Sequence, residues 1–281
     1  MSVRRSLTVL AAVSAAAATL TTAVLLSTTT GASAAGQELV TPIDSAVLEA
    51  KTPARAAVGA GRYAYDRPTP QNSVLLLVDH QVGLMSGVQD HASLAEYKNN
   101  VVALAKSAKA FKIPVILTTS NAQWQNGDLL PEIKAELPDT PIIRRTGIIN
   151  AYADPVFRKA LEATGRKHVL IAGVTLGTCT AFPTLSMLQD GYKVFPVVDA
   201  AGAWSKYEAD AAIDRMTAAG AEPVTVFPLL AELQYDWRRD TNPAAGEIFR
   251  QHLPEYGLVM DQFWTTVDPQ KRPADPFGLV G

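Results

Sequence analysis

Short apolar segments alternate with longer helical segments along most of the chain, and this alternation limits the folds open to it. The short segments are mainly apolar, as expected for parallel strands that are covered on both faces; they are residues 73–78, 115–119, 169–172, 192–198 and 222–226. Between them, apolar residues recur at helical spacing over residues 94–111, 156–163, 181–188, 207–219 and 229–237. The pattern predicts a three-layer α/β/α sandwich with a mainly parallel sheet and a Rossmann-like topology.

The first 34 residues have the pattern of a signal peptide. Arg4 and Arg5 precede an Ala-rich apolar run, and Ala32 and Ala34 form the small-x-small pattern that signal peptidase cuts. The paired arginines also resemble a twin-arginine signal, while an uncleaved membrane anchor is the alternative, because the run is nearly long enough to span. We expect cleavage after Ala34, a secreted or extracytoplasmic protein, and no membrane contact after cleavage.

Three segments follow the signal peptide. Residues 35–72 are rich in Ala and Pro and are expected to be an arm or linker with one short helix at 44–51. Residues 73–240 contain all the predicted strands and form the α/β domain. Residues 241–281 are expected to be a tail that packs on the domain or on a neighbouring subunit.

Charge, cysteine and histidine counts exclude several classes of function. Without residues 1–34, which hold two arginines and no acid, the 25 basic residues become 23 against 27 acidic ones, a net charge of −4. No basic cluster is present, so we expect no nucleic-acid partner. The single cysteine excludes an internal disulfide and a multi-cysteine metal site, and the four histidines show no metal-ligand spacing.

In parallel α/β sheets, ligands bind beyond the carboxyl ends of the strands, so the residues there are the candidates for a site. Cys179, the only cysteine, follows the strand at 169–172 and opens a helical segment. The positive end of a helix would stabilise its thiolate, the nucleophilic form. The alternative is a small buried apolar residue, since free cysteine is often buried.

Asp79 follows the first strand in the same way. A cysteine hydrolase needs a thiol, a base and a cation or donors that hold the developing charge. Asp79, Cys179 and one of the two arginines Arg144 and Arg145 would supply them at one edge of the sheet. The alternatives are a turn-capping role for Asp79 and a solvated charge for either arginine.

Several segments in the same order resemble the isochorismatase-like cysteine hydrolase superfamily and, within it, the YcaC-related hydrolases. The resemblance extends from residue 73 to residue 240. The matching segments are residues 77–81 (Leu-Val-Asp-His-Gln), 116–120 (Ile-Leu-Thr-Thr-Ser), 145–152 (Arg-Thr-Gly-Ile-Ile-Asn-Ala-Tyr), 171–173 (Ile-Ala-Gly), 179–183 (Cys-Thr-Ala-Phe-Pro), 198–200 (Val-Asp-Ala) and 236–240 (Asp-Trp-Arg-Arg-Asp).

The resemblance implies a catalytic triad of Asp79, Arg145 and Cys179, with Asp79 accepting the thiol proton. It also implies a non-proline cis peptide at Thr175–Leu176 and an oxyanion hole formed by backbone N–H groups around Leu176 and Cys179. No cofactor is expected. Nicotinamidase-type relatives carry a histidine metal site, but residues 119–128 have no histidine, so we expect no metal and disfavour nicotinamide as a substrate.

The chain departs from most relatives at three positions. Arg145 replaces a lysine, a change that the YcaC-related branch shares, and arginine acts only as a fixed cation and donor. Leu176 replaces a threonine, and Gly177 replaces an acidic residue. The last two changes alter the turn before Cys179.

Six further residues are candidates for the substrate pocket, and each has a plainer alternative. For the aromatic ones the alternative is ordinary packing, and for His80 it is a hydrogen bond to a backbone carbonyl rather than a proton relay. The candidates are His80, Asn121, Trp124, Asn150, Tyr152 and Phe182.

The favoured function is an exported hydrolase that cleaves the C–N bond of a small amide and works as a homo-oligomer. Two alternatives stay open at this point. One is a non-catalytic binding or assembly protein that keeps the fold; the changes at Leu176 and Gly177 in the turn before Cys179 favour it. The other is a redox-sensing thiol at Cys179.

Overall fold

The structure is a computed structural model and describes residues 65–267. The expected signal peptide (1–34), most of the expected arm with its helix at 44–51, and residues 268–281 of the expected tail lie outside the described residues.

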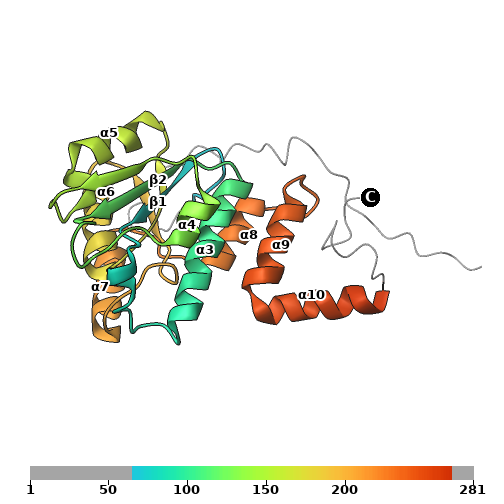
Figure 1. Cartoon of the computed structure of the whole chain (residues 1–281). Coiled ribbons are helices and arrows are strands. Elements are labelled where there is room, and N and C mark those ends of the chain that lie inside the picture. The colour runs from blue at the N-terminus through green and yellow to red at the C-terminus, as the bar shows by residue number, and fades with distance from the viewer. Residues whose placement is uncertain (1–64, 268–281) are drawn as a thin grey trace, which may run out of the picture. The chain divides into compact units, whose positions relative to one another are not determined.

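A five-stranded sheet forms the centre of the domain, and all of its strands are parallel. The strands are β1 (Ser73–Val78), β2 (Val115–Ser120), β3 (Ile142–Arg145), β4 (His168–Gly173) and β5 (Lys193–Pro196). Their order across the sheet is β3-β2-β1-β4-β5, with Val78 opposite Thr118 on one side and Gly173 on the other. The predicted α/β/α class with a mainly parallel sheet is confirmed (Figure 1).

Helices cover both faces of the sheet. In chain order they are α2 (Val82–Met85), α3 (Leu94–Ala110), α4 (Pro131–Glu136), η1 (Ala151–Ala153), α5 (Pro155–Ala163), the π-helical turn η2 (Leu176–Thr180), α6 (Ala181–Gln189), α7 (Lys206–Ala218), α8 (Val226–Gln234), α9 (Asn242–His252) and α10 (Pro254–Val267).

Two apolar clusters form the core, one on each face of the sheet. Leu75 and Leu77 of β1 pack into a larger cluster that includes residues of α3, α4 and α8. Val74, Leu76 and Val78 face the other way into a smaller cluster with residues of α5 and α6. Strand β1 is therefore buried on both faces, as its uniformly apolar sequence predicts.

Local sequence explains where several helices begin. Ser93 accepts the Glu96 N–H at 3.1 Å at the start of α3, and Ser205 accepts the Glu208 N–H at 3.2 Å at the start of α7. Asp154 caps α5, which begins at a proline. These are the N-cap residues that satisfy unpaired N–H groups in the first turn of a helix.

Two predictions about strands were wrong. β3 falls in a segment for which no strand was predicted, because two of its four residues are arginines and its pattern is not apolar. The predicted strand at 222–226 makes only a single bridge, Val197 to Val224, and α8 already begins at Val226. The proline at position 223 has no N–H to donate to a longer ladder.

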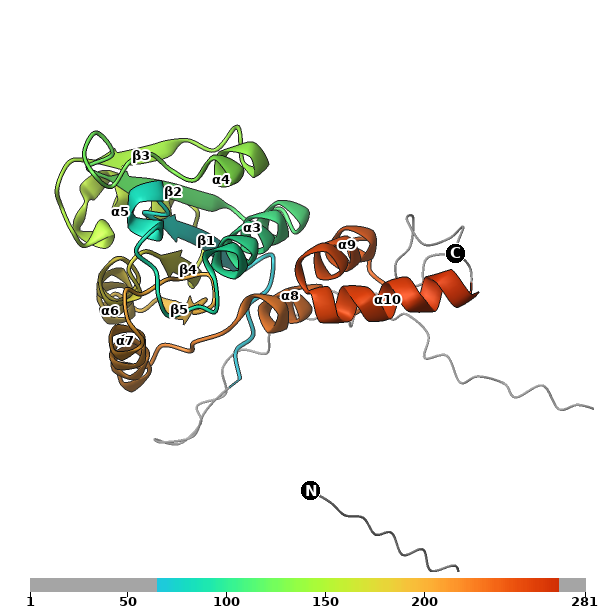
Figure 2. The same ribbon diagram turned by 60° about the horizontal axis from the view of Figure 1, so that its bottom comes forward.

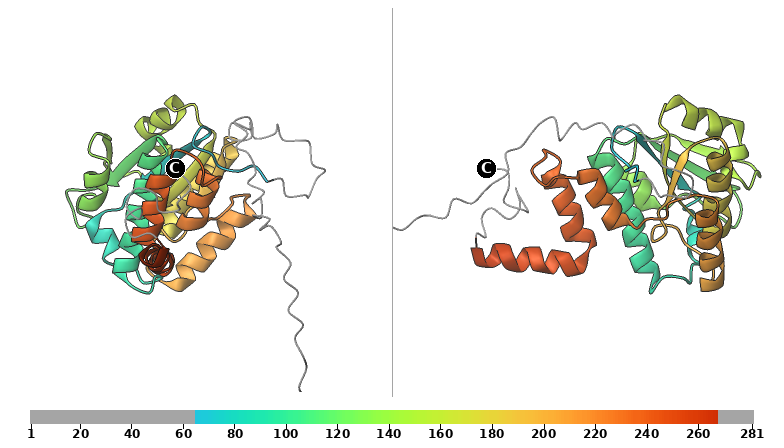
Figure 3. Two further views of the ribbon diagram at one scale, coloured as in Figure 1. Left: turned by 90° about the vertical axis from the view of Figure 1, so that its right-hand side faces the viewer. Right: turned by 180° about the vertical axis from the view of Figure 1, so that it is seen from behind.

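The first part of the expected tail consists of two helices. α9 packs on the domain through Ala245, Ile248 and Phe249, which belong to the larger apolar cluster. α10 follows directly and lies against α9 on the side away from the sheet (Figures 2 and 3). Within residues 65–267 no helix has both the length and the apolar character needed to cross a membrane.

Candidate active site

The strand order places Asp79 and Cys179 on either side of one gap at the edge of the sheet. β1 continues to β2 and β3 in one direction, whereas β4 and β5 lie in the other, so the order of the chain reverses between β1 and β4. Asp79 follows β1 and Cys179 follows β4 by a short turn. Ligands of open α/β sheets bind at such switch points.

The backbone at Asp79 turns its carboxylate toward Cys179. Side chains alternate along a strand, and continuing the alternation of β1 would point Asp79 into the cluster that holds Leu77. Its φ of 59° is instead left-handed, a conformation that aspartate tolerates better than most residues. The carboxylate therefore lies beside the thiol of Cys179, which belongs to the opposite cluster.

One carboxylate oxygen connects the three residues of the predicted triad. Asp79 Oδ2 accepts the Cys179 thiol at 3.4 Å and also forms an ion pair with the Arg145 guanidinium. Both charged side chains are almost completely buried. Asp79 Oδ1 is also buried and has no hydrogen-bond partner. The three residues come from the ends of three different strands, so only the folded sheet brings them together.

Arg145 is held from several sides. Its Nε donates to Thr118 Oγ1 at 3.0 Å, which lies on the strand between β3 and β1. Its Nη1 donates to the carbonyls of Ile148 and Ile149. Arg144, the other candidate, is more than half exposed and pairs with Asp128 at 3.3 Å on the surface. Arg145 is therefore the arginine of this site.

The turn before Cys179 differs from expectation. The cis peptide is Val174–Thr175, one bond earlier than predicted, and it lies between the end of β4 at Gly173 and the start of η2 at Leu176. The Leu176 N–H donates to Gly202 O at 2.7 Å. It is thus engaged within the fold, contrary to its predicted role as an oxyanion donor.

Among the described residues the Cys179 N–H has no hydrogen-bond acceptor outside its own helical turn. The N–H groups of Thr178 and Thr180, by contrast, both donate to Thr175 O, at 3.3 and 3.2 Å. Thr178 also contacts the thiol through its hydroxyl, at 3.7 Å from Sγ.

The resting thiol is protonated. Burial, and next the charge of Asp79, raise the pKa of Cys179 to about 12, although the Thr178 hydroxyl and Arg145 act in the opposite direction. The helix start was expected to favour the thiolate, and in the folded chain burial and the Asp79 charge act against it. Burial also raises the pKa of Asp79, and the Arg145 charge opposes this. A carboxyl group whose pKa is raised in this way is suited to accept and return a proton.

Two of the pocket candidates belong to a structural cluster at α6. Asn150 accepts the Tyr152 N–H at 3.1 Å and donates to Ser186 at 2.9 Å. Tyr152 donates to Asp190 at 2.7 Å and packs in the smaller cluster, which also includes Cys179. These contacts fix η1 to α6, and neither side chain has a polar contact with the triad.

The remaining candidates lie in different environments. Trp124 is 67% exposed, in the loop after β2. Asn121, in the same loop, has a left-handed φ of 47°, and its N–H donates to Arg145 O at 3.1 Å. Phe182 packs against the larger cluster, with Arg215 over its ring.

His80 is fully buried, and its Nε2 lies 2.9 Å from Ala200 O. Burial lowers its pKa to about 4, so the ring is neutral at physiological pH. This is the backbone contact that the sequence left open as the alternative to a proton relay.

Thr118, Thr178 and the carbonyls of residues 148 and 149 were missed by the sequence reasoning. Carbonyls carry no side-chain signal, and a threonine in an apolar strand resembles an ordinary core residue. Gln81, by contrast, was expected to be a structural residue that bonds backbone near the site, and this is confirmed. It accepts the Ser120 N–H at 2.8 Å and donates to Gly127 O, so it connects the segments that follow β1 and β2.

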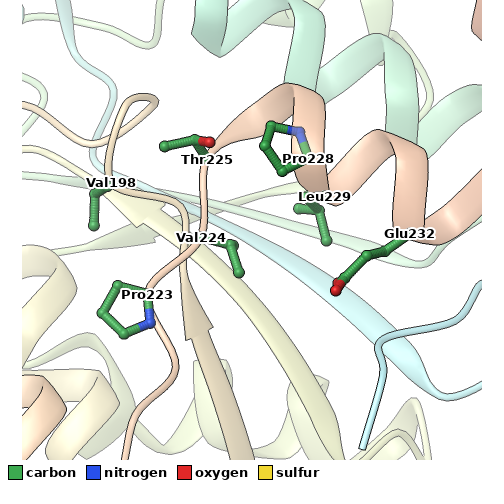
Figure 4. Close-up of a pocket in the computed structure, with 7 residues that line it drawn as sticks. All are labelled: Val198, Pro223, Val224, Thr225, Pro228, Leu229 and Glu232. Carbon is green, nitrogen blue, oxygen red and sulfur yellow. The ribbon is translucent and has the colours of Figure 1, made fainter. Parts of the chain in front are cut away.

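A pocket elsewhere on the domain contains none of the triad residues. It lies where the segment after β5 meets the start of α8 (Figure 4). Its only acidic residue, Glu232, accepts the hydroxyl of Tyr65 at 2.8 Å. The lining residues are Val198, Pro223, Val224, Thr225, Pro228, Leu229 and Glu232. Residues 65–267 also hold no group of three or more metal-ligating side chains.

Comparison with known proteins places this site in a family. The model of the isochorismatase domain matches residues 73–226. The probable hydrolase YcaC of Escherichia coli is 45% identical over 72% of this chain and 96% of its own length. Its crystal structure, described as an octameric hydrolase of unknown specificity, has a TM-score of 0.70 and covers 73% of this chain and 99% of that one, at 44% identity.

YcaC from Pseudomonas aeruginosa, solved with hexane-2,5-diol and covalent acrylamide, is 46% identical, with a TM-score of 0.70, and covers 72% of this chain and 99% of that one. The secreted isochorismatase effector Isc1 of Phytophthora sojae is 25% identical over 70% of this chain and 94% of its own length. The chain therefore belongs to the isochorismatase family, as a hydrolase of the YcaC-related branch.

Burial of His80 predicts a specific loss of stability in mild acid. Its pKa is about 4 in the folded protein and about 6.5 when unfolded, so the unfolded chain binds the extra proton between these values. The contribution is fully present above pH 6.5 and falls by about 3 kcal/mol as the pH drops to 4. We would measure the free energy of unfolding by urea for wild type and His80→Gln between pH 4 and pH 6.5, and it should change less with pH in the variant. The same pH dependence in both proteins would contradict the lowered pKa of His80.

Proposed function

We propose that this hydrolase cleaves the C–N bond of a small amide through an acyl-enzyme on Cys179. The observation that supports this most is the sharing of Asp79 Oδ2 between the thiol and Arg145. That arrangement supplies a nucleophile, a base and a fixed cation in one buried site. One relative of the same branch is described with covalent acrylamide, which is itself a small primary amide.

In the first half of the reaction, Asp79 takes the proton of the Cys179 thiol as Sγ attacks the carbonyl carbon. The carbonyl oxygen becomes an oxyanion and accepts the Cys179 N–H. The C–N bond then breaks, and the proton on Asp79 passes to the leaving nitrogen. The products of this half are ammonia or an amine and a thioester.

In the second half, Asp79 takes a proton from water, and the hydroxide attacks the thioester carbon. Collapse of this second tetrahedral species breaks the C–S bond and releases the acid, while the proton on Asp79 returns to the sulfur. Arg145 does not exchange a proton in either half. Its charge opposes the rise that burial causes in the pKa of the Asp79 carboxyl.

The raised thiol pKa disfavours a redox-sensing role. Sensor cysteines are exposed and have low pKa values, whereas Cys179 is 8% exposed and its pKa is raised to about 12. Ammonia release from small amides distinguishes the hydrolase from the non-catalytic alternative.

Removal of the thiol should abolish turnover. A panel of small primary amides is incubated with wild type and with Cys179→Ser, and ammonia release is measured together with intact protein mass. We expect a mass increase equal to the acyl group in wild type and a loss of roughly 10³-fold or more in rate for the variant. Full activity of the variant would rule out the acyl-enzyme.

Asp79→Asn provides the matched control at the same site. Its amide cannot accept the proton, so hydrolysis should fall by roughly 100-fold or more. The carboxylate also raises the pKa of Cys179, so its removal should make iodoacetamide alkylation of Cys179 faster below pH 10. A non-catalytic protein would release no ammonia in any of the three forms.

We further propose that the chain forms a homo-oligomer. The supporting observations are the octameric relative and the outer face of α10, where Leu258, Val259 and Phe263 are each more than half exposed. Sedimentation equilibrium should give a multiple of the monomer mass, and Leu258→Glu with Phe263→Glu should lower it. A monomeric wild type would contradict the proposal.

Export through the signal at residues 1–34 is also proposed. Its support is the residue pattern described above, and one relative is named as secreted. Expression of the full chain in a bacterial host should give a protein outside the cytoplasm that begins at Ala35, as N-terminal sequencing would show. Lysine at positions 4 and 5 should block export if the route is twin-arginine. A full-length protein retained in the cytoplasm would argue against export.

A further inference from the structure

Glu208, in the first turn of α7, contacts the turn that carries Cys179. Its Oε2 accepts the Trp204 N–H at 3.0 Å, next to the Ser205 cap of its own helix. Its Oε1 leaves the helix and accepts the Gly177 N–H at 3.3 Å. One side chain thus joins the start of α7 to the residue two positions before the cysteine.

The start of α3 shows the same capping arrangement without the second contact. There, Ser93 caps the helix, and Glu96 accepts the Ala92 N–H at 3.1 Å. Glu96 forms no hydrogen bond to any residue near the site. Capping alone therefore does not require the contact that Glu208 makes with Gly177, and the two helices form a natural pair for comparison.

Gly177 leaves the space that Glu208 occupies. A Cβ at position 177 would lie 2.8 Å from Glu208 Oε1, closer than such atoms approach in real structures, and 3.0 Å from its Cγ, so the Glu208 side chain would have to move. The Glu208 carboxylate reaches this turn from α7.

We propose that Glu208 is a positioning residue that holds η2, and with it Cys179, through its contact with Gly177. η2 is then fixed at two successive N–H groups, Leu176 by Gly202 and Gly177 by Glu208. The 3.4 Å contact of the thiol with Asp79 depends on the position of this turn. The consequence for turnover rests on the proposed function, whereas the consequence for thiol geometry does not.

The test compares Glu208→Ala with Ser205→Ala and Glu96→Ala. Ser205→Ala weakens the same helix start but leaves the contact with Gly177, and Glu96→Ala removes the equivalent capping glutamate of α3. Alkylation of Cys179 by iodoacetamide is followed by mass spectrometry from pH 6 to 11, well below each protein's melting temperature. Because Cys179 is the only cysteine, the mass change reports this residue alone.

Of these three variants, we expect only Glu208→Ala to change the pH dependence of Cys179 alkylation. A turn that is free to move weakens the Asp79 contact and exposes the sulfur, so the pH profile should shift toward that of an ordinary cysteine. Alkylation at pH 8 should then be roughly tenfold faster, while turnover of any amide substrate should fall roughly 10- to 100-fold. The two control variants should lose stability without moving the profile.

Gly177→Ala tests the same contact from the other side. The added methyl group displaces the Glu208 carboxylate, so the single variant should resemble Glu208→Ala. The double variant Gly177→Ala, Glu208→Ala should be no worse than Glu208→Ala, because the methyl group then enters vacated space and the two effects are not additive.

An unchanged alkylation profile in Glu208→Ala, or strictly additive effects in the double variant, would overturn the positioning role. If Cys179→Ser kept its activity while the profile shifted as expected, the proposed reaction would fail but the positioning role would stand.

Discussion

The buried pair of Asp79 and Arg145 is the interaction on which the site depends. Two charges without water are costly unless each finds partners, and a buried pair with one partner removed is strongly destabilising. Arg145 satisfies its remaining donors with Thr118 and with two backbone carbonyls. The pair therefore requires the ends of β1, β2 and β3 to stay in register, and it sets the charge that Cys179 meets.

The sequence predicted the layers of the fold and the edge of the sheet, because uniformly apolar strands and their carboxyl ends are local signals. It could not predict which ends are neighbours. That depends on the order β3-β2-β1-β4-β5, which places Thr118 between Asp79 and Arg145. Nor could it predict the left-handed backbone that turns Asp79 away from the face of Leu77, since that conformation arises only when the carboxylate meets its partners.

In the C-terminal segment, prolines stand at the starts of helices rather than in an irregular tail. Residues 241–281 were expected to be a tail, yet Pro243 and Pro254 each stand in the first turn of a helix, α9 and α10. Proline is tolerated there because the N–H groups of a first turn have no partner inside the helix. What makes α9 a stable helix is the burial of Ile248 and Phe249 in the core, which no local pattern reveals.

The sequence of the turn before Cys179 favoured a loss of activity, and a contact between Gly177 and Glu208 changes that interpretation. The resemblance implies an acidic side chain at position 177, and its absence favours a loss of activity when only the local sequence is considered. In the folded chain a glycine leaves room for the Glu208 carboxylate to reach the backbone of that turn, because a Cβ would lie 2.8 Å from Glu208 Oε1. The effect of Gly177 on the site therefore depends on Glu208, which is 31 residues away in the sequence.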